Sequence, residues 1–133
     1  MIFSKRVFFW SGVYGCCLLV PMLFLEQKLG QDFPPASNHP EQYYGFLGVA
    51  IAWQIAFILI STNPIQYRLM MLPAIAEKLL SGIPAAWLYL TGRIDEVTTI
   101  PFVVDLLIGC LFIAGYYVTS REANKQTSSI ATS

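Results

Sequence analysis

Three ionisable side chains stand inside otherwise apolar stretches of this 133-residue chain, where their chemistry is unusual. Glu77 and Lys78 are adjacent, and Asp105 lies in the next apolar stretch. If these stretches cross a bilayer, each charge costs about 2.5 to 3.5 kcal/mol, which makes such residues candidates for proton paths or polar pockets. Gln54 joins them, because Gln54 and Glu77 both lie about 12 Å from the same membrane edge at 1.5 Å per residue. The candidate intramembrane polar network is therefore Gln54, Glu77, Lys78 and Asp105.

The spacing of these residues also predicts how they pair. Neighbouring helical positions point about 100° apart, so Glu77 and Lys78 are not expected to face each other. Gln54, at the level of Glu77, is its expected partner on the preceding helix. Asp105 lies about 21 Å from its own helix end, level with Ser81, so a bridge from Lys78 to Asp105 requires the two helices to shift.

Two interpretations of the network remain open. The ionisable groups can line a polar pocket or proton path, or they can form a structural network that holds the helices in register. The chain has no Ser-His-Asp set, HExxH sequence or glycine-rich phosphate loop, so it offers no catalytic or cofactor-binding residue and favours a non-enzymatic protein without a cofactor. It has a single histidine and three cysteines, and Cys16, Cys17 and Cys110 fit no zinc-ligand spacing, so no metal site is expected.

The elements that must position the network are four apolar stretches. Apolar residues make up 56% of the chain and charged residues 12%, about half the charge share of an ordinary soluble domain. Residues 7–25, 43–62, 69–90 and 100–119 contain no charged side chain except Glu77, Lys78 and Asp105. Each stretch is close to the roughly 20 residues that a helix needs to cross a bilayer. The sequence therefore predicts an all-α protein with four transmembrane helices.

Basic residues near the ends of these stretches predict the orientation. Five lie on one side and two on the other: Lys5, Arg6, Arg68, Arg121 and Lys125 against Lys28 and Arg93. The positive-inside rule then places both termini in the cytoplasm of a multi-pass protein of the inner (plasma) membrane. The net charge is zero, so the lipid bilayer is the expected partner and nucleic acid is not.

The connecting segments complete the expected layout. Residues 26–42 contain Pro34, Pro35 and Pro40 and predict an outer loop, while the short link 63–68 predicts that the second and third helices form an antiparallel hairpin. Residues 120–133 are polar and predict a disordered cytoplasmic tail after a transmembrane domain at 1–119.

Small residues four apart indicate where helices can approach closely in a bilayer. Every predicted helix has such residues, and they are Ser11 with Gly15, Gly12 with Cys16, the run Gly48, Ala52 and Ala56, Ser81 with Ala85, Gly82 with Ala86, and Cys110 with Ala114. A compact antiparallel four-helix bundle uses all of them.

Short sequence runs resemble small uncharacterised four-helix bacterial membrane proteins, loosely the DoxX-like group. The runs are Trp53-Gln54, Asn63-Pro64-Ile65-Gln66-Tyr67-Arg68, Leu72-Pro73-Ala74 and Glu77-Lys78. The resemblance implies a subunit of a quinone-linked oxidoreductase or an accessory membrane protein, and it assigns no site residue. Together with the missing catalytic motif, it favours a structural or accessory subunit of a membrane complex or a homo-oligomer. The alternative is a proton-coupled or small-solute transport module that uses Glu77, Lys78 and Asp105.

Overall fold

The described part of the protein, residues 2–32 and 38–133 of a computed structural model, is helical and contains no strand, so the all-α prediction is confirmed. The elements in chain order are α1 (Ile2–Met22), α2 (Glu26–Asp32), α3 (Pro40–Thr62), the short 3-10 helix η1 (Arg68–Met70), α4 (Met71–Leu90) and α5 (Glu96–Ala131).

Three segments are long and apolar enough to cross a membrane: α3, η1 with α4, and α5. A fourth span results if α1 and α2 count together, although α2 is bent from α1 by 85°. The predicted stretches 43–62 and 69–90 lie within α3 and η1–α4, so the helical segments agree closely there. The outer loop predicted at 26–42 differs, because its first residues form α2 before the prolines begin. Pro34 and Pro35 of that loop lie outside the described residues.

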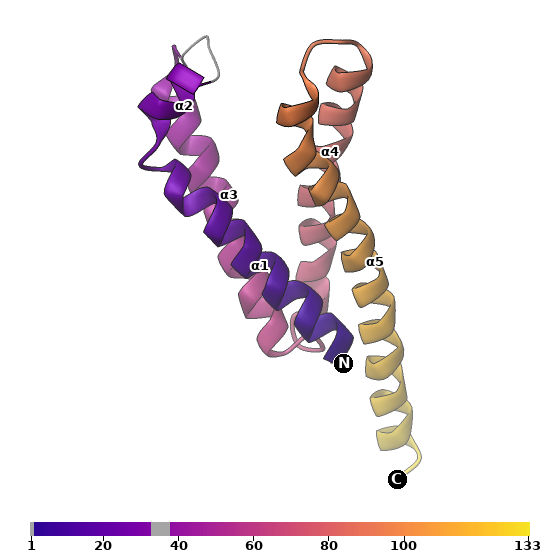
Figure 1. Cartoon of the computed structure of the whole chain (residues 1–133). Coiled ribbons are helices and arrows are strands. Elements are labelled where there is room, and N and C mark those ends of the chain that lie inside the picture. Colours follow the sequence, from indigo (N-terminus) through magenta and orange to yellow (C-terminus); the bar gives the residue numbers. More distant parts are fainter. Residues whose placement is uncertain (1, 33–37) are drawn as a thin grey trace.

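The helices are arranged as two pairs that form a V (Figure 1). α1 packs along α3, and α4 packs along α5. The pairs meet at the end where both chain termini and the connection between α3 and α4 lie, and they diverge toward α2 and the turn between α4 and α5. The predicted hairpin of the second and third helices is therefore wrong as a packed pair, because α3 and α4 contact each other little beyond their connection. Each packs instead in a pair whose helices approach closely at glycine.

Close approach at glycine explains the pairing. A Cβ atom on Gly12 of α1 would lie 2.7 Å from the Gln54 carbonyl oxygen of α3, and a Cβ atom on Gly82 of α4 would lie 2.5 Å from the Leu106 side chain of α5. The small residues predicted to pack α3 behave differently. Gly48 and Ala52 are exposed, and nothing lies within 4 Å of a Cβ atom built on Gly48.

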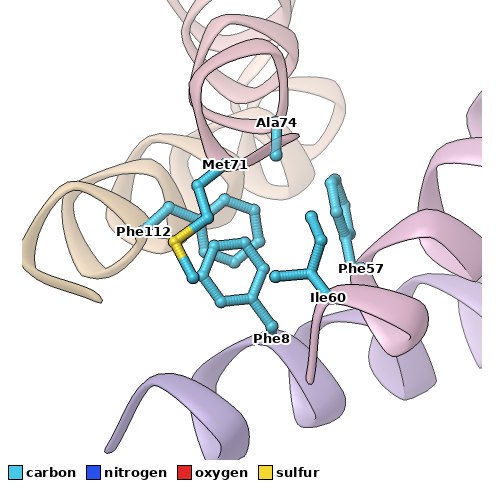
Figure 2. Close-up of a cluster of buried hydrophobic side chains, with 6 residues drawn as sticks. All are labelled: Phe8, Phe57, Ile60, Met71, Ala74 and Phe112. Atoms are coloured by element: carbon cyan, nitrogen blue, oxygen red, sulfur yellow. The ribbon is translucent and has the colours of Figure 1, made fainter. Parts of the chain in front are cut away.

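An aromatic cluster joins the two pairs where they meet (Figure 2). It consists of six buried residues: Phe8, Phe57, Ile60, Met71, Ala74 and Phe112. The rings of Phe8 and Phe112 stack with centroids 4.1 Å apart, and Phe57 meets Phe112 edge to face at 4.9 Å. Aromatic pairs of this kind contribute about 0.5 to 1.5 kcal/mol beyond the area that they bury. The cluster therefore fixes the vertex of the V.

Buried hydroxyl groups add polar contacts between α1 and α5 at the same end. Ser4 donates a hydrogen bond of 3.0 Å to the Gly115 carbonyl oxygen, and Thr119 donates one of 2.9 Å to Ser4. The chain of two hydrogen bonds ties the first turn of α1 to α5.

The C-terminal residues continue α5 through Ala131, whereas the sequence predicts disorder from residue 120. No proline or glycine follows Gly115, and Lys125 pairs with Glu122 at 3.0 Å, a spacing that supports a helix. The 36 residues of α5 extend about 54 Å, which exceeds a bilayer core of about 30 Å.

The turn between α4 and α5 has conventional helix ends. Gly92, with a φ of 74°, follows the last turn of α4, where glycine is favoured because this conformation is unfavourable for residues with a Cβ atom. Asp95 caps α5, where its carboxylate accepts a hydrogen bond of 3.3 Å from the Thr98 amide. Hydrogen bonding from Thr98 lowers the pKa of Asp95 below its usual range.

Candidate functional site

A cavity of about 510 Å³ lies between the two helix pairs. Polar side chains line its inner part: Gln54, Glu77, Lys78, Ser81 and Asp105. The apolar walls include Leu18 of α1, Phe46 of α3 and Phe102 of α5. Glu26 of α2 and Thr98 near the start of α5 also line it, so the cavity extends to the end where the pairs diverge. All four residues of the candidate network therefore border one space.

The strongest contact in the cavity is an ion pair between α4 and α5. Lys78 Nζ lies 2.9 Å from Asp105 Oδ1, and the Lys78 side chain is only 5% exposed. The Ser81 hydroxyl donates a hydrogen bond of 2.9 Å to the other oxygen, Oδ2. Asp105 thus has a partner for each carboxylate oxygen.

This bridge forms directly, although counting from residue 119 placed Asp105 too high for Lys78. That residue is not a helix end, because α5 continues to Ala131, so it was a poor reference for depth. The same counting placed Asp105 level with Ser81, and their hydrogen bond agrees with it.

Glu77 has a weaker environment than Asp105. Its Oε2 atom lies 3.6 Å from Lys78 Nζ, which makes an ion pair but is longer than a hydrogen bond. The expectation that these neighbours do not pair is wrong, because the lysine side chain is long enough for its ammonium to reach the adjacent carboxylate. Oε2 is buried and has no hydrogen-bond partner among the described residues, while the side chain as a whole is 19% exposed. Glu77 is the less satisfied of the two carboxylates.

Gln54 does not hydrogen-bond Glu77, contrary to prediction. Its Nε2 atom donates a hydrogen bond of 3.1 Å to the Ala50 carbonyl oxygen of its own helix. Its Oε1 atom lies against Gly15 of α1, in the space that a Cβ atom on Gly15 would occupy. Gln54 is 2% exposed, and Oε1 has no hydrogen-bond partner among the residues described. The reason is the packing of α3 against α1, which directs Gln54 to α1 rather than across to α4.

The aromatic cluster adjoins the inner end of the cavity at Lys78. The Lys78 ammonium lies 5.2 Å from the centroid of the Phe57 ring, a cation-π distance. Phe57 belongs to the cluster that joins the pairs, so Lys78 borders both the cavity and the aromatic cluster. The lining of the cavity runs from Gln54 and Lys78 to residues of α2 and the start of α5, which lie at the end of the V away from the chain termini (Figure 1).

Sequence reasoning missed two members of this site. Ser81 was recognised as a small residue level with Asp105 but not as a member of the network, although a hydroxyl three residues after Lys78 lies on the same helical face. Phe57 was not singled out. Its position three residues after Gln54, on the same helical face, could have indicated that it lies near the network. Both residues follow a recognised polar residue by one helical turn.

The cysteines make no arrangement with Lys78 or the carboxylates. Cys16, Cys17 and Cys110 are unpaired thiols, and Cys17 and Cys110 are exposed on helix surfaces. Within residues 2–32 and 38–133, no group of three His, Cys, Asp or Glu side chains is placed to hold a metal ion. The polar side chains that line the cavity offer charge pairing and hydrogen bonding among apolar walls.

Comparisons with protein-family models, curated proteins and solved structures gave no match. The DoxX-like resemblance stays a prediction, and the function must be argued from the cavity.

Proposed function

We propose that the chain is a multi-pass membrane protein that crosses the membrane four times, with both termini in the cytoplasm. The helical lengths support this, with α1 and its bend into α2 as the first span. The five basic residues counted for the cytoplasmic side belong to the start of α1, to η1 and to the C-terminal part of α5, and these segments lie at the end of the V that carries the termini (Figure 1). In this orientation the cavity widens toward the outer side of the inner membrane.

The cavity is the solute site of a small transport module in a state open to the outer side. The observation that carries this proposal is that Gln54, Glu77, Lys78 and Asp105 line one cavity of about 510 Å³ whose walls are apolar. Ligand sites typically combine apolar walls with a few converging polar groups, and their volumes are about 300 to 1,000 Å³. A purely structural network would be expected to satisfy its own polar atoms, whereas Glu77 and Gln54 leave acceptors unused.

The direction of opening supports transport over simple storage of a ligand. The aromatic cluster separates the cavity from the cytoplasmic end, so release on that side requires the two pairs to part at Phe8, Phe57 and Phe112. Alternating access in small transporters is a rocking of packed helix groups about a central site. Two helix pairs that meet at one vertex have the construction for such a motion.

A cavity-filling substitution with a matched control tests this function. Ala50 of α3 lines the cavity, whereas Ala52 of the same helix is exposed on another face. We expect wild type and Ala52→Phe to bind and take up members of a panel of small amines, carboxylates and alcohols in proteoliposomes, and Ala50→Phe to lose both activities. Binding by no member of the panel, or equal activity in the two variants, contradicts the proposal.

An accessory subunit is the second candidate, and the open shape of the cleft favours it. Leu18 and Phe46 on the cavity walls are 40% and 58% exposed, so a helix of a partner or a second copy would bury them. If a partner fills the cleft, we expect a stable complex when the protein is extracted from the membrane with a mild detergent. The mass of the purified particle, corrected for detergent, distinguishes this candidate from a monomeric transport module.

A further inference from the structure

The charges that line the cavity are unbalanced. Three carboxylates border it, those of Glu26, Glu77 and Asp105, and the one basic side chain is Lys78. Lys78 is engaged by Asp105 at 2.9 Å, and the Glu26 carboxylate accepts a hydrogen bond of 2.8 Å from Tyr44. Glu77 is left with the 3.6 Å contact to an ammonium that Asp105 already neutralises. When Glu77 and Asp105 are ionised, the inner part of the cavity therefore holds two negative charges against the single positive charge of Lys78.

The polar atoms without hydrogen-bond partners in this part of the protein are also acceptors, which favour a positively charged donor. Glu77 Oε2 and Gln54 Oε1 are both acceptors, both are buried, and neither has a partner among the described residues. Gln54 is 2% exposed, so water does not readily replace a missing donor there. A buried acceptor without a donor costs about 1 to 3 kcal/mol, which a ligand with N–H groups recovers when it binds.

From these two observations we infer that the transported or bound solute carries a protonated primary amine on an apolar body. The ammonium lies beside Glu77, where it supplies the missing positive charge and donates N–H groups to the Glu77 carboxylate. The apolar body occupies the wall region beside Leu18, Phe46 and Phe102. This inference rests on the proposed solute site and adds the class of solute.

Hydrogen bonding and charge make separate demands on such a ligand. A carboxylate would place a second negative charge beside Glu77 and Asp105 and would offer no donor. A neutral alcohol offers one donor without charge, and a quaternary ammonium offers charge without a donor. Charge-assisted hydrogen bonds are about twice as strong as neutral ones, so the primary amine is favoured over all three.

Four probes with one apolar body test the inference: 3-phenylpropylamine, 3-phenylpropanol, 3-phenylpropanoate and trimethyl(3-phenylpropyl)ammonium. Calorimetric titration of the full chain in detergent, against detergent alone, should show the amine binding about tenfold or more tightly than each of the others. In Glu77→Gln the amine should lose its advantage over the alcohol. Glu122→Gln, which changes a carboxylate on α5 that does not line the cavity, should leave the order unchanged.

The outcomes separate the inference from the proposed function. Equal or tighter binding of 3-phenylpropanoate overturns the amine assignment while the solute site stands. Binding of none of the four probes removes both. Wild-type protein alone decides the order of affinities, so poor folding of Glu77→Gln leaves the test intact.

The amine can belong to a dissolved solute or to a lipid headgroup. Phosphatidylethanolamine and phosphatidylcholine differ in whether the headgroup nitrogen carries N–H groups, so displacement of bound 3-phenylpropylamine by the first alone identifies a lipid source. Displacement by neither identifies a dissolved amine, and either result agrees with the inference. Equal displacement by both lipids contradicts it, because phosphatidylcholine has no N–H donor.

Discussion

Lys78 of α4 and Asp105 of α5 form a 2.9 Å ion pair at the inner part of the cavity, with Lys78 almost completely buried. The pair fastens α4 to α5 and leaves Glu77, the neighbour of Lys78, without a cation of its own. One contact thus contributes both to the packing of a helix pair and to the charge of the cavity.

Removing one partner of this pair should be costly, and removing both should not. We expect Asp105→Leu to lower the free energy of unfolding by about 3 kcal/mol, the lower part of the range for a broken buried pair, because Asp105 is 21% exposed. The double substitution Lys78→Met with Asp105→Leu should recover most of that loss, since it removes both members of the 2.9 Å pair and takes from Glu77 only its weaker 3.6 Å contact. Denaturant unfolding in detergent measures the free energy of unfolding of Lys78→Met, Asp105→Leu and the double variant. A loss in the double variant equal to the sum of the two single losses would contradict the pairing.

Gly15 should not tolerate a methyl group. A Cβ atom there would overlap the side chain of Gln54, so Gly15→Ala should lower the free energy of unfolding by about 1 to 3 kcal/mol. Gly48→Ala is the control on α3, because its Cβ atom would meet nothing and alanine favours a helix by about 0.5 to 1 kcal/mol. Opposite shifts in thermal unfolding are expected, and equal shifts would show that α1 and α3 do not pack as described.

The aromatic cluster should dominate the stability of the vertex. Phe112 is fully buried and contacts both Phe8 and Phe57, so Phe112→Ala should cost about 3 to 5 kcal/mol. Leu111, the next residue along α5, is 45% exposed, and its substitution by alanine should change stability little. A comparable loss in the two variants would place the contact between the pairs elsewhere.

The cap of α5 predicts a response to pH. Because the pKa of Asp95 is lowered in the folded state, this carboxylate stabilises the helix start above about pH 4, and the effect is lost as the pH falls through the lower folded pKa. Hydrogen exchange at the Thr98 and Thr99 amides, corrected for its intrinsic pH dependence, should show this fraying. Asp95→Asn keeps a capping side chain and should remove the pH response. An unchanged response in Asp95→Asn would assign it to another group.

The helical class and two of the helices could be predicted because hydrophobicity and length determine them. The predicted stretches 43–62 and 69–90 fall within Pro40–Thr62 and Arg68–Leu90. The pairing of helices could not be predicted, because each span is apolar on all its faces. A short connection between two helices does not determine which faces pack. Gly48 and Gly12 look equivalent in sequence, yet only Gly12 lies at a helix contact.

The members of the polar network could be predicted, whereas their contacts could not. A charge in an apolar stretch is conspicuous, so Glu77, Lys78 and Asp105 were found directly. Which partner each takes depends on helix pairing, and the predicted hairpin gave Gln54 the wrong neighbour. The cavity itself has no local sequence signal, because it results from the angle between the two pairs.

Labelling with a membrane-impermeant maleimide tests the central claim, an outward-opening cavity between two helix pairs, most directly. In a protein whose three cysteines are replaced by alanine, Ser81→Cys places a thiol in the cavity, and Ala74→Cys places one on the same helix in the fully buried aromatic cluster. We predict that reagent added on the outer side of the membrane labels the first thiol and not the second. Labelling of Ser81→Cys only from the cytoplasmic side, or of neither thiol from either side, would contradict the account.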